Sequence, residues 1–140
     1  MKIFFFNSGN PQLGSNRIYI HNLSSWLEEL NVKTVVSNDL SKTKDCDVII
    51  LNKFTKYNQF KKLRNLNEKS KIGLIHPSDL HHDFKNKLKY IDFFITGSIE
   101  EKDHYYSYKK NIFRFPQIEK INLKSKNHDN ENTYISIGYH

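Results

Sequence analysis

The feature that most constrains the fold is a regular alternation of short apolar runs with amphipathic stretches. The apolar runs are rich in β-branched and aromatic side chains, which is typical of strands buried on both faces. Six runs fit this description, at residues 3–6, 32–36, 48–51, 72–75, 93–96 and 112–115. Strands that alternate with helices form right-handed βαβ units and a parallel sheet. We therefore expect an α/β fold, a Rossmann-like parallel sheet of about six strands with helices on both faces.

Helical spacing fills the stretches between these runs. After the first run, one apolar face recurs at intervals of three and four residues, formed by Tyr19, Leu23, Trp26, Leu27 and Leu30. Tyr57, Phe60 and Leu63 predict a second, basic helix. The pattern Ser-x-x-Glu from Ser98 to Glu101 is a capping box, which predicts that a helix begins there.

Composition divides the chain into three parts. We expect residues 1–121 to form the Rossmann-like domain. Residues 122–132 are rich in Lys, Asn, Asp and Glu, which is typical of a linker. Residues 133–140 contain a new apolar run and are expected to be the start of a truncated second domain. Cys46 is the only cysteine, so no internal disulfide is expected and a reducing cytoplasm is the default.

The net charge of +7 comes from the middle third of the chain. Between Lys53 and Lys89 there are ten Lys or Arg residues and three acids, and the remainder carries twelve of each. Five of these cations could share an exposed helical face: Lys56, Lys61, Lys62, Arg64 and Lys69. Such a face favours contact with an anionic membrane, although lysines also simply solvate helices. Nucleic acid is not expected, because Tyr57 and Phe60 suit the core better than an exposed stacking surface.

Candidate site residues follow from the position of ligands in open α/β sheets, which bind beyond the carboxyl ends of the strands where the strand order reverses. If the order is 3-2-1-4-5, strands one and four are neighbours. The loop 7–17 and the segment 75–79 then line one crevice. The loop contributes Gly14, Ser15 and Arg17, and the segment contributes His76 and Asp79.

The chemistry of these residues leaves alternatives open. Ser15 stands where a phosphate-binding P-loop requires Lys, so that fingerprint fails. A glycine loop that opens a helix still favours an anion, and Arg17 adds a forked cation; otherwise Gly14 only makes the turn. His76 suits a base or a hydrogen-bond anchor for a hydroxyl, or it is satisfied by neighbouring backbone.

A dense run of metal-ligand residue types follows the fourth apolar run: His76, Asp79, His81, His82 and Asp83. No subset has a recognised zinc spacing. We therefore expect neither a metal nor a cofactor.

Four segments resemble GT-B glycosyltransferases, in particular the family 1 and family 4-like group. Residues 13–18 and the helix ending in Leu27-Glu28-Glu29-Leu30 are similar to the first βα turn of that family. Residues 92–103 resemble a strand, serine and acidic helix late in its N-terminal domain. Residues 115–119 look like its interdomain crossing, and residues 135–140 look like the first strand and glycine turn of its C-terminal domain.

The resemblance implies the N-terminal half of an enzyme that transfers a sugar from a nucleotide-sugar donor to a glycan or lipid-linked acceptor, in cell-surface polysaccharide synthesis. In that family the N-terminal domain mainly holds the acceptor, and the C-terminal domain mainly holds the donor. Gly14, Ser15 and Arg17 would lie near the donor phosphates or the acceptor, and His76 would lie beside the transferred sugar as the catalytic residue. The chain alone is expected to be inactive, cytoplasmic and peripheral at the inner face of the membrane.

The alternative is a non-catalytic binding module of flavodoxin-like or receiver-like type. A strand order of 2-1-3-4-5 would favour it and would move the crevice to Asn52 and Lys53, away from His76. A receiver-like module also requires a phosphorylatable Asp at the end of the third strand, where this chain has Asn52.

Overall fold

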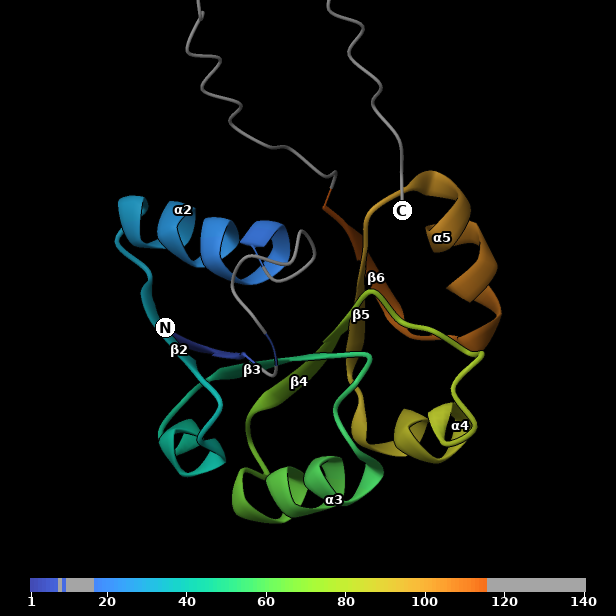
Figure 1. Cartoon of the computed structure of the whole chain (residues 1–140), viewed down its shortest axis with the longest axis horizontal. Coiled ribbons are helices and arrows are strands. Elements are labelled where there is room, and N and C mark those ends of the chain that lie inside the picture. The colour runs from blue at the N-terminus through green and yellow to red at the C-terminus, as the bar shows by residue number, and fades with distance from the viewer. Residues whose placement is uncertain (8, 10–16, 116–140) are drawn as a thin grey trace, which may run out of the picture.

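The computed structural model describes residues 1–7, 9 and 17–115. Six strands form one parallel sheet: β1 (Lys2–Phe6), β2 (Lys33–Ser37), β3 (Val48–Asn52), β4 (Lys71–Ile75), β5 (Phe93–Thr96) and β6 (Asn111–Arg114). Each predicted strand is confirmed to within one residue at either end. The predicted α/β class with a Rossmann-like parallel sheet is therefore correct (Figure 1).

Helices occupy the predicted stretches between strands. The π-helical segment η1 (Arg17–Asn22) continues into α2 (Leu23–Glu29), and α3 spans Tyr57–Leu66. The helix α5 spans Ile99–Tyr105, and Ser98 caps its start as the sequence predicts. Shorter turns that the sequence did not indicate are η2 (Leu40–Thr43), α4 (Phe84–Lys87), η3 (Leu88–Tyr90) and η4 (Tyr106–Tyr108). No helix in the described part of the chain is long and apolar enough to cross a bilayer.

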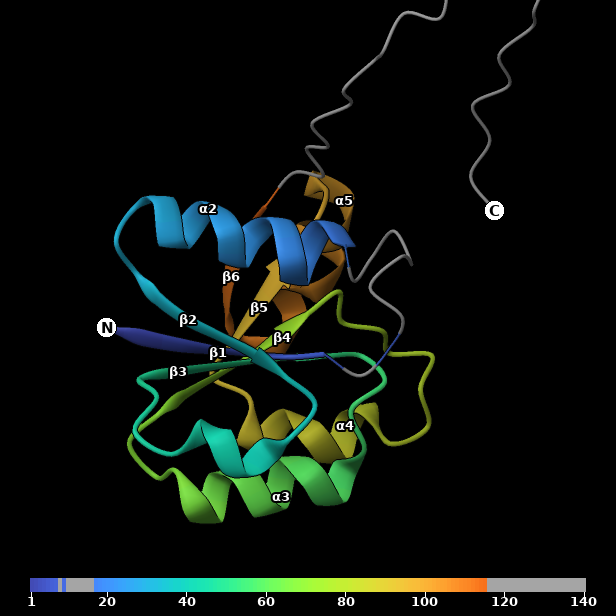
Figure 2. The ribbon, with the colours of Figure 1, turned by 60° about the vertical axis from the view of Figure 1, so that its left-hand side comes forward.

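The strand order is β2-β1-β3-β4-β5-β6, so the expectation that strand four lies beside strand one is wrong. The strand β1 pairs with β2 on one side and with β3 on the other. After β2 the chain passes through η2, which contacts both β1 and β2 and lies on the face opposite to α2 (Figure 2). A right-handed connection on that face reverses the direction of travel. The connection therefore places β3 beside β1, at the edge where the order 3-2-1-4-5 would place strand four.

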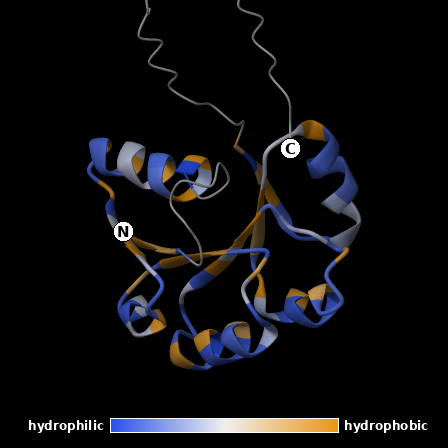
Figure 3. Cartoon of the chain, viewed as in Figure 1, coloured by the Kyte–Doolittle hydropathy of each residue, from blue (hydrophilic) through white to orange (hydrophobic). Residues whose placement is uncertain are grey.

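Two apolar layers sandwich the sheet. On one face, η1 and α2 pack Tyr19, Leu23 and Leu27 against side chains that include Ile3, Phe5, Ile50, Ile75 and Ile95. On the other face, α3, α4 and α5 contribute Phe60, Leu63, Phe84 and Tyr105, packed on Phe4, Leu51 and Phe94. Apolar colour accordingly predominates in the inner strands, while the helices carry both colours (Figure 3). Helices thus cover both faces, as expected.

At the amino end of the sheet, Arg64 ties α3 to two strands. Its guanidinium donates to the carbonyl oxygens of Ser70 and Tyr90 at 2.9 and 2.8 Å, and to Oδ2 of Asp92 at 2.6 Å. Oδ2 of Asp92 also accepts from the N–H of Ile72 at 2.7 Å. The expectation that Arg64 belongs to an exposed basic face is therefore wrong, because its charge is committed to the fold. Lys61, Lys62 and Lys69 are exposed.

Candidate ligand site at the carboxyl end of the sheet

His76 lies directly beyond the end of β4, in an uncommon backbone conformation. Its φ is 47°, in the left-handed region, and its N–H donates to the carbonyl oxygen of Ile95 at 3.0 Å. This conformation costs free energy for residues other than glycine, and residues that adopt it cluster at functional sites. Histidine tolerates it better than most side chains. The turn directs the chain away from the sheet while the hydrogen bond holds His76 at the end of β5.

Glu101 on α5 fixes the His76 ring. Oε1 of Glu101 lies 3.1 Å from Nδ1 of His76, and Oε2 accepts from the N–H of Gly97 at 2.6 Å. Ser98 accepts from the N–H of Glu101 at 3.1 Å, which is half of the predicted capping box. Glu101 reaches back one residue beyond Ser98, to Gly97, and simultaneously to His76. A residue that the sequence assigned to helix capping therefore orients a candidate catalytic histidine.

Tyr19 on η1 packs against the other side of this corner. Its ring meets that of His76 edge-on, with centroids 4.1 Å apart and an interplanar angle of 82°. A Cβ atom at Gly97 would lie 2.4 Å from the Tyr19 hydroxyl, so only glycine fits there. The tyrosine is fully buried. The first helix thus reaches His76 although β3 separates β1 from β4.

Asp79 lies on the same loop as His76 but serves a different contact. Its Oδ2 is 2.7 Å from Nε2 of His104, and this hydrogen bond lowers the pKa of the Asp79 carboxyl. Its N–H donates to the Tyr105 hydroxyl at 3.3 Å, and that hydroxyl donates to the carbonyl of Pro77 at 2.8 Å. Asp79 therefore anchors the β4–α4 loop to α5, whereas Glu101 engages His76.

The other predicted residues are placed only in part. Arg17 begins η1, two residues before Tyr19, on the segment that reaches His76. Gly14 and Ser15 lie outside the described residues, so their place in the site stays a prediction. Sequence reasoning missed Tyr19, Gly97 and Glu101 as site residues. A capping-box glutamate immediately beyond the carboxyl end of a strand was the signal that could have pointed to Glu101.

The observed strand order puts the reversal between β1 and β3, where the alternative hypothesis places its crevice. Asn52 is buried there, and its Oδ1 accepts from the N–H of Phe54 at 3.1 Å and the hydroxyl of Thr55 at 3.4 Å. Its side chain is thus committed to the turn after β3. A separate polar pocket lies at the carboxyl ends of β1 and β2, lined by Asn7, Gly9, Val36, Ser37 and Asn38.

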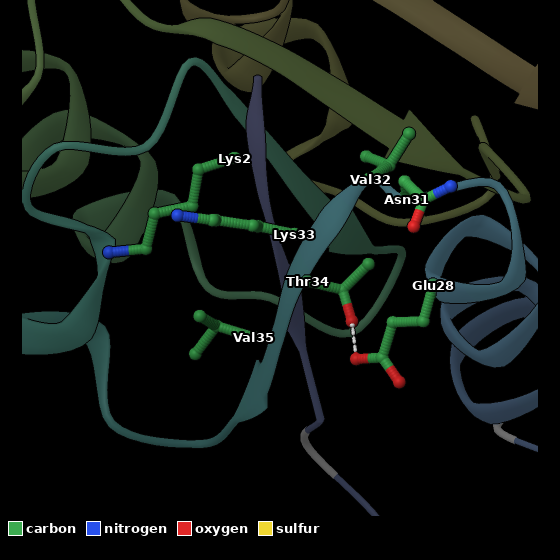
Figure 4. A pocket seen from close by; sticks show the side chains of 7 residues that line it. All are labelled: Lys2, Glu28, Asn31, Val32, Lys33, Thr34 and Val35. Atoms are coloured by element: carbon green, nitrogen blue, oxygen red, sulfur yellow. Dashed lines mark hydrogen bonds between the residues drawn. The ribbon is translucent and has the colours of Figure 1, made fainter.

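A second pocket lies at the opposite, amino end of the same two strands (Figure 4). Its polar lining includes Lys2 and Lys33, and Thr34 donates a hydrogen bond to Glu28. Ligands of open α/β sheets bind at the other edge, so this pocket is not the candidate site.

Metal-ligating side chains do not converge in the described part of the chain, where no group of three or more His, Cys, Asp or Glu residues is placed to hold an ion. The dense run after β4 is instead divided between separate partners. His76 pairs with Glu101, Asp79 with His104, and Asp83 with Lys87 at 2.8 Å. Cys46 is buried, and burial raises the pKa of its thiol, which disfavours the reactive thiolate.

Comparison with known proteins adds no functional assignment. No model of a known protein family matches the chain, and no curated protein matches it. The geometry around His76 is therefore the main indication of function.

Proposed function

We propose that the chain is the acceptor-side domain of a glycosyltransferase, which transfers a sugar from a nucleotide-sugar donor to a glycan or lipid-linked acceptor. The observation that carries the proposal is the His76–Glu101 pair at the carboxyl end of β4, with a nitrogen–oxygen distance of 3.1 Å. A histidine oriented by a carboxylate is the usual arrangement for removing a proton from a hydroxyl. The His76 side chain is 20% exposed, so it is accessible but partly shielded from water.

The proposed step assigns a role to each neighbour. An imidazole that donates its Nδ1 proton to Glu101 carries its lone pair on Nε2. Nε2 accepts the proton of the acceptor hydroxyl while that oxygen bonds to the anomeric carbon and the bond to the nucleotide diphosphate breaks. Glu101 stabilises the imidazolium that forms, and Tyr19 holds the ring plane. Arg17, on the same helical segment as Tyr19, would favour the anionic leaving group.

The resemblance to GT-B enzymes also supports a site around His76. One of its segments, residues 92–103, includes Gly97 and Glu101. Another leads into η1, which carries Tyr19. Segments far apart in the sequence, each selected for its similarity to one family, thus meet around His76.

The strand order favours a second candidate, a non-catalytic module of flavodoxin-like type, because β2-β1-β3-β4-β5 is the order of that fold. Its ligand would lie where the strand order reverses, between β1 and β3, beside Asn52 and Lys53. A receiver-like module is disfavoured, since Asn52 stands where a phosphorylatable Asp is required.

Histidine-ring NMR of the full chain tests the two candidates. Methyl glucoside and methyl N-acetylglucosaminide, titrated to millimolar concentration, should shift the ring resonances of His76 and leave those of His104 unchanged. The exposed pair of His104 with Asp79 makes it a matched internal control. UDP is titrated separately, to test whether an anion binds near Arg17.

Two results would count against the proposed enzyme. One is an unchanged His76 resonance at every sugar concentration. The other is a set of shifts confined to the amides of Asn7, Asn52 and Lys53, which would favour the non-catalytic module.

A further inference from the structure

Two large apolar side chains are exposed on neighbouring loops at the carboxyl end of the sheet. Phe54, in the turn after β3, is 62% exposed, and Leu80, in the loop after β4, is 94% exposed. The Phe54 ring lies edge-on to that of His81, with centroids 5.8 Å apart, so the two loops are in contact. Figure 2 shows both loops leaving the same edge of the sheet. We call Phe54, Leu80 and His81 the loop tip.

Both loops are held by other residues, so the exposure of the tip is not required by the fold. Asn52 closes the first turn, and Thr55 rather than Phe54 is buried in it. In the second loop, Asp79 is bound to His104 and Phe84 enters the core. An apolar pair displayed by well-anchored loops indicates an interaction surface.

The surroundings of the loop tip are cationic. Nζ of Lys53 lies 5.3 Å from the centre of the Phe54 ring, and Lys56 and Lys85 are exposed on the flanking segments. Both acids of the second loop are engaged by other side chains. Asp79 pairs with His104, and Asp83 pairs with the buried ammonium of Lys87. Lysines on both flanking segments therefore give the surroundings of the apolar tip a positive charge.

We infer that the loop tip docks on an anionic phospholipid surface. Phe54 and Leu80 enter the boundary between headgroups and acyl chains, and the lysines contact lipid phosphates. A side chain as exposed as Leu80 projects outward, which suits insertion into a deformable lipid layer. The inference goes beyond the proposed function, since it requires neither a sugar nor His76.

The loop tip replaces the α3 face as the membrane contact that the charge pattern suggested. Arg64 is committed to Asp92 and two carbonyl groups, so it cannot contribute a free charge to that face. Lys61 and Lys62 stay exposed on α3, as does Leu66 at 61%. These three residues provide matched controls, because they offer the same side-chain types away from the tip.

Vesicle co-sedimentation of the full chain tests the inference. The chain should bind vesicles that contain phosphatidylglycerol, bind phosphatidylcholine vesicles far more weakly, and lose affinity as salt rises. The double variant Phe54→Ser, Leu80→Ser should lose about tenfold or more in partitioning, since each side chain gives up apolar burial. Leu66→Ser should change partitioning by less than about twofold, as expected for a residue outside the contact. Lys53→Ser with Lys56→Ser should weaken binding more than Lys61→Ser with Lys62→Ser.

A fluorescent probe locates the contact independently. Trp26 is the only tryptophan, so Phe54→Trp in a Trp26→Phe background reports on the loop tip alone. Its emission should shift to the blue with anionic vesicles and be quenched by brominated lipid. The inference is overturned by absence of binding at low salt, by equal binding to neutral vesicles, or by binding that survives Phe54→Ser, Leu80→Ser. Circular dichroism of each variant confirms that the fold is kept.

Discussion

Two side-chain pairs bracket the ends of β4, and they differ in what their partners are. At the amino end, Arg64 and Asp92 bond to one another and also to backbone groups of Ser70, Ile72 and Tyr90. At the carboxyl end, His76 and Glu101 bond to one another, and Glu101 also accepts a hydrogen bond from the backbone N–H of Gly97. The first pair satisfies backbone groups where α3 meets the starts of β4 and β5. The second pair connects a left-handed loop residue to a helix.

The difference indicates which pair serves stability. Bonds from a charged group to buried backbone satisfy donors and acceptors that would otherwise be lost from water. His76 instead occupies a conformation that costs free energy. We expect substitutions at the amino end to affect unfolding and those at the carboxyl end to affect ligand binding.

The largest effect is expected from Arg64→Met. Methionine keeps much of the apolar stem but removes the hydrogen bonds to Ser70, Tyr90 and Asp92. The free energy of unfolding should fall by about 2–3 kcal/mol, as for other hydrogen bonds of charged groups. Urea denaturation measures the change, with Lys61→Met on the same helix as the control. A loss no greater than that of the control would show that the amino-end pair is dispensable.

The same pair should respond to pH. Burial alone would raise the pKa of Asp92, but the Ile72 N–H and the Arg64 guanidinium outweigh it and hold the pKa below its ordinary value of 3.8. A carboxyl whose pKa is lower in the folded state contributes stability above its unfolded pKa. That contribution is lost as pH falls below 3.8 through the folded pKa. Urea midpoints at acidic pH should therefore decline less in Asp92→Asn than in the native chain.

Gly97→Ala tests how tightly the residues at the carboxyl end of the sheet are packed. The new methyl group would lie 2.4 Å from the Tyr19 hydroxyl, and Tyr19 is fully buried, so the corner must shift. We expect a loss of about 1–3 kcal/mol, as for other overpacked positions. In a Tyr19→Phe background the penalty should shrink, because the clashing oxygen is gone. Thermal unfolding of the four chains measures this coupling, and an unchanged penalty would refute the assigned contact.

His76→Asn should separate stability from binding. Asparagine also tolerates a left-handed backbone, so the free energy of unfolding should change by less than about 1 kcal/mol. Glycoside-induced shifts of the neighbouring Gly97 amide should nevertheless disappear, because the proposed hydrogen-bonding ring is gone. Retained shifts would place the sugar elsewhere on the sheet edge.

The smallest effect is expected from His104→Ala. The His104 side chain is 55% exposed, and its pair with Asp79 lies at the surface. The free energy of unfolding should fall by less than about 0.5 kcal/mol, which is the usual range for solvated pairs. A loss comparable with that of Arg64→Met would show that the β4–α4 loop, and not the amino-end pair, limits stability.

Much of the architecture could be predicted because strands and helix starts depend on local pattern. The run Phe93–Thr96 is four apolar or β-branched residues between turn signals, and it became β5 with the predicted limits. Ser98 began a helix because a serine hydroxyl accepts from the third N–H after it. Such features involve neighbours within a few residues, so they can be read from the chain alone.

The sequence by itself therefore determined the six strands, their parallel arrangement and the helices on both faces. Only the tertiary structure decided that β3 lies beside β1, that Arg64 binds Asp92, and that Glu101 and Tyr19 meet at His76. The physical reason is that the inner strands of a parallel sheet are apolar on both faces, so the pattern does not specify their neighbours. Those neighbours depend on which face each connection crosses, and contacts between distant side chains exist only after that choice.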